Sequence, residues 1–217
     1  MIERDITERK QAEQQQEMLL AELNHRVKNA LATVLSIASR TRKVTDSLDE
    51  FYHAFDGRLR ALASTHDLLA KNVWSGADLR QVLLAELEPY NAEKGAIHLS
   101  GRNLFVSPRA AVVFGMIFHE LATNAAKYGA LSGAAGNVGV AWKMDGADGA
   151  DTFVLDWLEN GGPGAEAGEK QGFGLKFIER SIAYELQGTA ELRFDPGGLH
   201  VRIRAPMSEV TGAPGLQ

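Results

Sequence analysis

Apolar residues recur at alternating intervals of three and four near the start of the chain, and this spacing predicts one long helix over residues 8–43. The apolar stripe consists of Leu20, Leu23, Val27, Ala30, Val34 and Ile37. Residues 8–17 are mostly Gln, Glu, Lys and Arg, which indicates a solvated connector. Only from Met18 onward does the helix therefore carry an apolar face that can pack against another element.

A second amphipathic helix is predicted after residue 47, where Ser47 and Glu50 form a capping box. One face of this helix carries Phe51, Phe55, Leu59, Leu62, His66 and Leu69. Because a short loop separates the two helices, the pattern favours an antiparallel helical hairpin over residues 18–72. A lone hairpin buries only one face, so it needs a partner, either a second copy or the downstream domain.

The pattern changes to mixed helix and strand after a linker at residues 71–76. Further helices are predicted at 79–88, from Ser107 and Pro108 to about Tyr128, and at 175–187. Alternating apolar and polar residues predict strands around 97–100, 138–142, 153–157 and 201–203. Helices on one side of a mostly antiparallel sheet form an α+β sandwich.

The predicted organisation is α+β with four parts. A connector helix at 1–17 leads into an all-α helical hairpin at 18–72. An α/β sandwich domain follows at 73–207, and the tail at 208–217 is expected to be disordered.

Composition narrows the class of protein. The chain has 217 residues, of which 45% are hydrophobic and 24% charged, as in ordinary soluble proteins. A net charge of −5 argues against general nucleic-acid binding, and the lack of cysteine excludes disulfides and thiolate metal sites. No apolar run approaches the roughly 18 residues of a membrane span. The charged N-terminus has no signal-peptide core, so we expect a cytoplasmic protein without a membrane segment.

His25 falls at the exposed f position of the heptad in which Leu20 and Leu23 are a and d. Surface histidines are common, so this position alone is compatible with an incidental residue. On this position alone the incidental interpretation is favoured, but the f position is also where a rigid helix would present an imidazole to another group.

A second polar set lies on the helix that starts at Pro108. At about 100° per residue, Glu120, Asn124 and Lys127 share a narrow sector beside the apolar stripe of that helix. An Asn oxygen suits Mg²⁺, a carboxylate holds the waters of a metal, and a lysine meets phosphate as a point charge. The simpler interpretation is a helix with an ordinary polar face.

Two glycine-rich segments follow this helix. The first, Gly161-Gly162-Pro-Gly, comes directly after a predicted strand, and the second, Gly172-Phe-Gly174-Leu, opens a helix. Glycines at a helix N-terminus let backbone N–H groups approach an anion. Neither segment is a Walker A loop or a dinucleotide fingerprint. The intervening residues 165–171 are small and charged, a composition typical of a lid.

Four motifs, taken together and in their order along the chain, match a known family. They are the run His25-Arg-Val-Lys-Asn29, the stretch from His119 to Ser132, the Trp157-x-Glu159 motif with its glycines, and the Gly172–Leu175 box. The chain resembles the transmitter region of bacterial sensor histidine kinases, specifically the HWE branch related to the HisKA_2 group. The resemblance covers about residues 18–206.

The resemblance implies a Bergerat-type ATP-binding domain that uses ATP and Mg²⁺, and a hairpin on which His25 accepts phosphate. It implies that Asn124 coordinates Mg²⁺ with the support of Glu120. It further implies that Lys127 contacts phosphate, that Tyr128 lies near the nucleotide, and that Glu159 accepts from the adenine amino group. The nucleotide would be approached by the backbone of Gly161, Gly162, Gly172 and Gly174. His119 would be structural or support the metal ligands, and Trp157 would pack in the sheet or contact nucleotide.

One position departs from the family pattern. Arg26 stands where common histidine kinases carry an acidic residue after the phosphoacceptor. Glu22, one turn earlier, is a candidate substitute, and Arg26 and Lys28 are candidates to hold phosphate oxygens.

The resemblance also implies partners. A response-regulator receiver domain would accept phosphate from His25, and the hairpin would be able to form a homodimer. Residues 4–13 resemble the exit from a PAS or LOV sensor domain that is absent here, so we expect a fragment of a longer receptor or a chain served by a separate sensor. Two alternatives stay open: a phosphotransfer or scaffold protein with a degenerate ATP domain, and a Bergerat-fold ATPase in which His25 is incidental.

Overall fold

The chain divides into two compact units, residues 1–43 and residues 44–217. The computed structural model describes residues 2–43, 45–90, 96–133, 136–146, 151–162 and 173–212. Within these ranges, the side chains of residues 2–9, 11–13, 19, 22, 26 and 173 lie outside the described part.

The first unit is a single helix, α1 (Ile2–Arg42). The predicted long helix is therefore confirmed, and it begins earlier than the apolar pattern indicated. Leu20, Leu23 and Val27 are 51%, 57% and 50% exposed, and Leu31 and Leu35 are exposed as well. The predicted stripe is thus exposed from Leu20 to Val27, whereas Ala30 and Val34 are half-buried and Ile37 is buried.

Helix α2 (Leu48–Lys71) opens the second unit. The Ser47 hydroxyl accepts a hydrogen bond from the Glu50 amide at 3.2 Å, as the capping box predicts. The Glu50 carboxylate reaches back one residue further than expected and accepts from the Asp46 amide at 3.1 Å. Because α2 belongs to the second unit, the division at residues 43 and 44 differs from the predicted boundary after residue 72.

The face that α2 buries is shifted from the predicted one. Its buried residues are Arg58, Ala61, Leu62, Thr65 and Leu69. Leu59, which was expected on this face, is 36% exposed. Phe51 and Phe55 stack on each other with ring centres 5.5 Å apart.

The core of the second unit is a five-stranded sheet in the order β2-β4-β5-β7-β6. Its strands are β2 (Ile97–Ser100), β4 (Asn137–Asp145), β5 (Thr152–Asn160), β6 (Thr189–Asp195) and β7 (Gly198–Pro206). Only the β2–β4 pair is parallel, and the other pairs are antiparallel, so the predicted mostly antiparallel sheet is confirmed. The short strands β1 (Ala77–Asp78) and β3 (Phe105–Val106) form a separate ladder.

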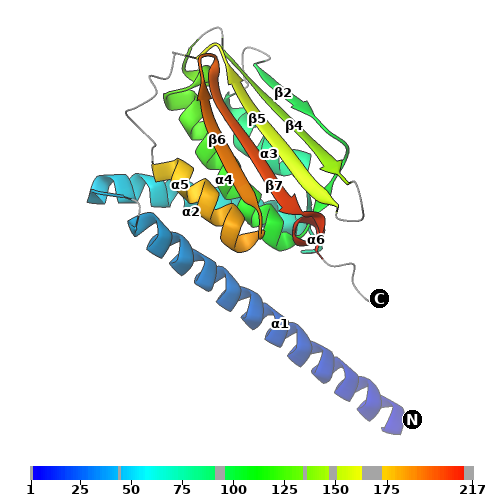
Figure 1. Cartoon of the computed structure of the whole chain (residues 1–217). Helices are drawn as coiled ribbons and strands as arrows, with labels where there is room; N and C mark the ends of the chain where they lie inside the picture. Colours follow the sequence, from blue (N-terminus) through cyan, green and yellow to red (C-terminus); the bar gives the residue numbers. More distant parts are fainter. Residues whose placement is uncertain are drawn as a thin grey trace. The chain divides into compact units, whose positions relative to one another are not determined.

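Helices cover one face of this sheet (Figure 1). They are α3 (Leu79–Leu87), α4 (Pro108–Lys127) and α5 (Phe173–Glu185), with the short η1 (Glu88–Tyr90) and η2 (Ala130–Ser132) beside them. The start of α4 follows the sequence signals, because the Ser107 hydroxyl accepts from the Ala110 amide and Pro108 occupies the first turn. The predicted α+β architecture is therefore confirmed.

Helix α4 is the centre of the packing. It contacts the neighbouring helices α2, α3 and α5. Its apolar residues Val113, Phe114, Ile117 and Leu121 are buried in one core cluster with strand residues such as Trp157 and Ile203. Phe114 also packs against Phe153 of β5, with ring centres 5.4 Å apart.

Strand β6 and helix α6 (Met207–Thr211) are among the elements that the sequence did not predict. Val210 of this short helix is fully buried. The Ser107 amide donates to the Val210 carbonyl at 2.8 Å, which ties this helix to the start of α4. The predicted disorder is therefore wrong for residues 208–211, and residues 213–217 lie outside the described part.

None of the helices in the described ranges combines the length and the apolar character needed to cross a membrane.

The contact between α2 and α4 depends on a glycine. A Cβ added at Gly115 would clash with the Thr65 hydroxyl, which is buried and already donates to the Ala61 carbonyl at 2.9 Å. We predict that Gly115→Val lowers the free energy of unfolding by about 2 kcal/mol, or the melting temperature by about 4–8 °C. The control is Gly139→Val, since a Cβ at Gly139 on β4 meets nothing within 4 Å. Equal melting temperatures for the two variants would contradict the close packing.

Candidate functional site

The C-terminal third of α4 brings two of the predicted site residues together with the start of α5. A Cβ added at Gly174 would lie 2.5 Å from Glu120 Oε2 and 3.2 Å from Asn124 Nδ2. The side chains of Glu120 and Asn124 therefore both face the backbone of Gly174, and both are partly exposed. The predicted sector on α4 and the predicted glycine box thus meet in the folded unit.

Glu120 has a partner that the sequence did not reveal. Arg58 Nε donates to Glu120 Oε1 at 2.8 Å, and the side chains are 1% and 13% exposed. The Arg58 guanidinium also lies over the Phe177 ring, 4.0 Å from its centre. A signal was present, because Arg58 shares helical spacing with Ala61, Leu62 and Thr65. A charge within such a stripe indicates a buried ion pair.

Lys127 and Tyr128 end α4 with exposed side chains. Tyr128 is 67% exposed at the C-cap position. Both are accessible to a ligand at this end of the helix.

Glu159 lies inside the protein. It is 4% exposed, its Oε1 accepts from the Trp157 indole N–H at 3.1 Å, and its Oε2 accepts from the Ala130 amide at 3.0 Å. Burial raises the pKa of Glu159 above its usual value, and these two hydrogen bonds oppose the rise. Trp157 is fully buried, so its side chain packs in the core and orients the Glu159 carboxylate.

The glycines after β5 permit a close approach of two backbones. Gly161 adopts φ 74°, a left-handed conformation that favours glycine. A Cβ at Gly162 would lie 2.9 Å from the Ala130 amide nitrogen. The segment therefore packs directly against the turn that follows α4. Gly172, Pro163, Gly164 and the predicted lid at 165–171 lie outside the described residues.

His119 has a structural position. Its Nδ1 lies 2.9 Å from Oε2 of Glu86, which is 8% exposed on α3. A Cβ at Gly57 would lie 2.6 Å from His119 Nε2, so the ring also packs against α2. Of the two roles considered for His119, the structure supports the structural one.

His25 is exposed on α1, as the heptad position predicts. The Asn29 amide group, one turn later, lies 3.5 Å from His25 Nε2. The side chains of Glu22 and Arg26 lie outside the described part, so their proposed roles stay predictions.

The described residues contain no group of three His, Cys, Asp or Glu side chains that would hold a metal ion. A cation at Glu120 and Asn124 would therefore take most of its ligands from water and from a bound anion. Mg²⁺ binds in this manner, with one or two protein oxygens and several waters or phosphates. The pair fits a hard, phosphate-associated cation.

Known proteins that resemble this chain are histidine kinases. The family model described as HWE histidine kinase matches residues 22–103. Over 208 residues the chain is 38% identical to the blue-light-activated histidine kinase of Brucella ovis, covering 95% of this chain and 42% of that protein. The corresponding Brucella anthropi protein is 38% identical over 205 residues, with 94% and 42% coverage. The chain belongs to the HWE histidine kinase family. It spans 42% of the length of these relatives.

Solved structures show the same fold. The blue-light activated histidine kinase EL346 of Erythrobacter litoralis superposes with a TM-score of 0.62 at 20% identity, covering 88% of this chain and 59% of that one. Its isolated histidine kinase domain gives a TM-score of 0.56 at 14% identity, covering 84% of this chain and 95% of that one. The fold of this HWE family member is thus that of histidine kinases, with a Bergerat-type α/β sandwich.

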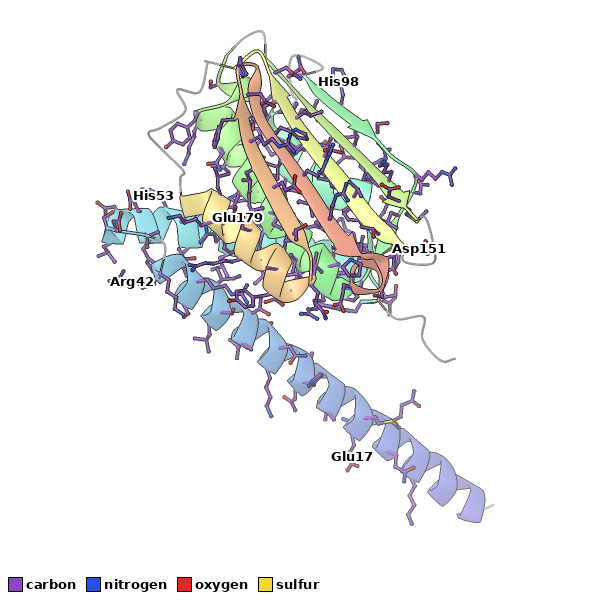
Figure 2. The ribbon with its side chains drawn as sticks, in the orientation of Figure 1. Glu17, Arg42, His53, His98, Asp151 and Glu179 are labelled. Atoms are coloured by element: carbon purple, nitrogen blue, oxygen red, sulfur yellow. The ribbon has the colours of Figure 1, made fainter. Side chains whose placement is uncertain are left out.

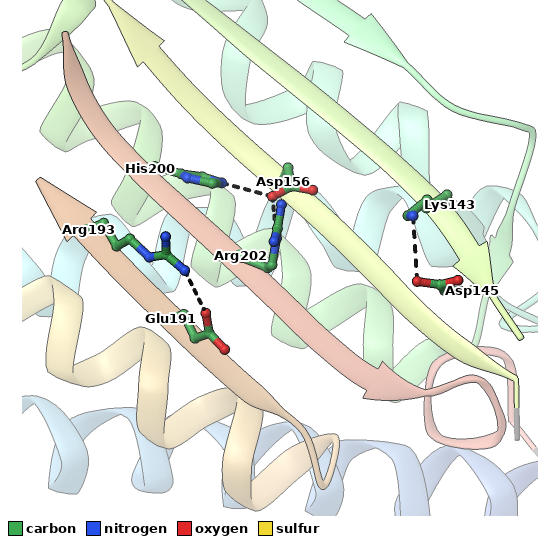
Figure 3. Close-up of polar contacts among 7 residues, drawn as sticks. All are labelled: Lys143, Asp145, Asp156, Glu191, Arg193, His200 and Arg202. Carbon is green, nitrogen blue, oxygen red and sulfur yellow. Dashed lines mark hydrogen bonds and ion pairs between the residues drawn. The ribbon is translucent and has the colours of Figure 1, made fainter. Parts of the chain in front are cut away.

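A separate polar cluster lies on the sheet face opposite the helices (Figure 3). Asp156 Oδ1 accepts from Arg202 Nε at 2.8 Å and lies 2.8 Å from His200 Nε2. Burial alone would raise the pKa of Asp156, but the hydrogen bonds from Arg202 and His200 outweigh it and lower the pKa. The cluster stabilises the pairing of β5 with β7.

We predict that Asp156→Asn lowers the free energy of unfolding by about 1 kcal/mol at pH 7. Because the folded-state pKa is lowered, the stabilisation is present above the ordinary aspartate value of 3.8 and is lost as the pH falls through the pKa of the folded protein. Urea unfolding of both proteins between pH 7 and pH 3 measures the difference. Asp195→Asn, at the exposed end of β6, is the control. A difference that persists unchanged in acid would contradict the assignment.

Proposed function

We propose that this chain is the kinase core of a two-component sensor, which phosphorylates His25 from Mg·ATP and passes the phosphate to an aspartate of a response regulator. The observation that carries the proposal is the convergence of Glu120, Asn124 and Gly174 within a histidine kinase fold. Exposure of His25 on a separate helical unit supports its role as the acceptor.

The ATP site would be built from α4, the turn after it and the two glycine segments. Asn124 and Glu120 would hold the Mg²⁺ ion, which neutralises charge on the phosphates. Lys127 and Tyr128 would contact the nucleotide from the exposed end of α4. The backbone N–H groups of Gly161, Gly162, Gly172 and Gly174 would approach it, because glycine leaves room for a phosphate or ring.

Glu159 would act at the adenine end of this site. Its carboxylate already accepts from Trp157 and Ala130, and each carboxylate oxygen has capacity for a second donor. The adenine amino group would be such a donor. The protein donors hold the carboxylate in place before the nucleotide arrives.

The phosphoryl transfer requires little covalent chemistry from other residues. A nitrogen of His25 attacks the γ-phosphorus, the bond to the β-phosphate oxygen breaks, and ADP leaves. The resulting phosphohistidine stands on an exposed helix face, where a receiver domain has access to it.

The proposed function also implies binding partners, a second copy of the chain and an upstream sensor. The exposed stripe that includes Leu20, Leu23, Val27, Leu31 and Leu35 would pair with a second α1 in a homodimer. An upstream sensor of the PAS or LOV type would act on α1. The names of the Brucella and Erythrobacter relatives favour light as the class of signal in this family branch. The cytoplasmic location stays a prediction.

We predict that His25→Ala abolishes autophosphorylation but leaves ATP binding intact, because the residues of the ATP site lie in the other unit. The measurement is incubation with γ-labelled Mg·ATP, followed by mapping of the acid-labile, base-stable phosphate. The control is His53→Ala, an exposed histidine on α2 (Figure 2). Label retained in the His25 variant would overturn the acceptor assignment.

The same experiment separates the two alternatives. Phosphate released into solution without a labelled protein would identify an ATPase. Nucleotide binding without any turnover would identify a phosphotransfer or scaffold protein.

We predict that Asn124→Ala abolishes Mg²⁺-dependent nucleotide binding, because it removes the amide oxygen of the proposed metal site. A calorimetric titration with a non-hydrolysable ATP analogue, with and without Mg²⁺, measures this. Asn103→Ala, in an exposed loop, is the control. Unchanged affinity in the Asn124 variant would exclude the metal role.

A further inference from the structure

Arg58 is a buried cation on a helix whose other buried residues are uncharged. Its side chain is 1% exposed, and the same face of α2 buries Ala61, Leu62, Thr65 and Leu69. Transferring a guanidinium out of water is costly, and a buried ion pair contributes little net stability compared with an apolar contact. Packing alone therefore does not account for a charged residue at this position.

The contacts of Arg58 join three helices at one point. Its Nε–H bonds Glu120 Oε1 of α4 at 2.8 Å, and its flat guanidinium face lies 4.0 Å from the centre of the Phe177 ring of α5. Phe177 follows Gly174 by one helical turn. Arg58 thus spans from α2 to both helices that carry the proposed nucleotide site.

The pairing leaves the two oxygens of Glu120 in different environments. Oε1 is taken by Arg58, whereas Oε2 faces the backbone of Gly174 near the Asn124 amide. Because a guanidinium donates in fixed directions, it determines the rotation of the carboxylate. One oxygen is anchored and the other is presented beside Asn124.

We propose that Arg58 is a positioning residue that orients Glu120 toward the metal ion of the nucleotide site and makes that site sensitive to the placement of α2. The proposal rests on the proposed function, since it presumes that Glu120 and Asn124 act on Mg·ATP. A shift of α2 relative to α4 would pull the carboxylate from Asn124 and loosen the Phe177 contact of α5. Helix α2 would in this way control metal-assisted binding without touching the nucleotide.

Two variants test this role. Arg58→Met removes the charge and keeps an unbranched apolar chain, whereas Arg58→Lys keeps the charge but loses the Nε–H donor and the flat face. Arg60→Met is the matched control, because Arg60 lies on the same helix and pairs with Asp56 at the surface.

The readout is the affinity for a fluorescent ATP analogue in Mg²⁺ and in excess chelator. We expect Arg58→Met to weaken Mg²⁺-dependent binding by about tenfold or more, the usual effect of losing a group that orients a metal ligand. Binding in chelator should stay within about twofold of the unmodified chain, as should all affinities of the Arg60 variant. Arg58→Lys should show the same Mg²⁺-selective loss of affinity. If the methionine variant does not fold, the lysine variant provides the test.

A double-variant cycle identifies Glu120 as the intermediary. In a Glu120→Gln background, Arg58→Met should change Mg²⁺-dependent affinity by less than about twofold, because the orienting contact is already lost. Equal losses with and without Mg²⁺, additive effects with Glu120→Gln, or no loss at all would overturn the proposal. Failure of the unmodified chain to bind any nucleotide would instead overturn the proposed function on which it rests.

Discussion

Helix α4 is surrounded by other elements along most of its length, and this constraint determines how the second unit is organised. The sheet covers the side that carries Phe114 and Ile117, and α2, α3 and α5 contact the helix as well. A polar side chain on such a helix needs a partner, because an unpaired buried charge is costly. The constraint explains why α3 brings Glu86 to His119 and why α2 brings Arg58 to Glu120. The neighbours of α4 are therefore selected by charge as well as by shape.

Buried polar groups are also paired where β5 meets the turn after α4. The Trp157-x-Glu159 motif forms a buried unit in which the indole and the Ala130 amide hold one carboxylate. Gly129 lies so close to Glu159 that a Cβ there would clash with its Oε2. The motif that marks the family thus first fixes β5 to the turn after α4. Among the described residues near this turn, Gly161 and the side chains of Lys127 and Tyr128 are exposed.

Local patterns predicted most of the fold because they are encoded by neighbours in sequence. The Ser47 and Ser107 caps, the long first helix and the alternating strands all depend on residues within a few positions of one another. Strand β6 was missed because only the weakly apolar alternation of Ala190, Leu192 and Phe194 marks it. The spacing of Arg58 within the buried stripe of α2 was a local signal of an ion pair, but its partner Glu120 is 62 residues away and no local rule identifies such a partner. The two compact units divide at residues 43 and 44 rather than after the predicted hairpin, since α2 contacts the later helix α4.

The strand order has a consequence for how the protein is made. Strand β7 lies between β5 and β6, yet it follows both of them in the sequence. During translation β6 leaves the ribosome with no neighbour to pair with, and it stays unpaired until residues 198–206 follow. The helix that buries Val210 comes later still. The sheet therefore closes only once residues 198–211 have been made, so the nascent chain exposes an incomplete core until then and depends on rapid completion or chaperone cover.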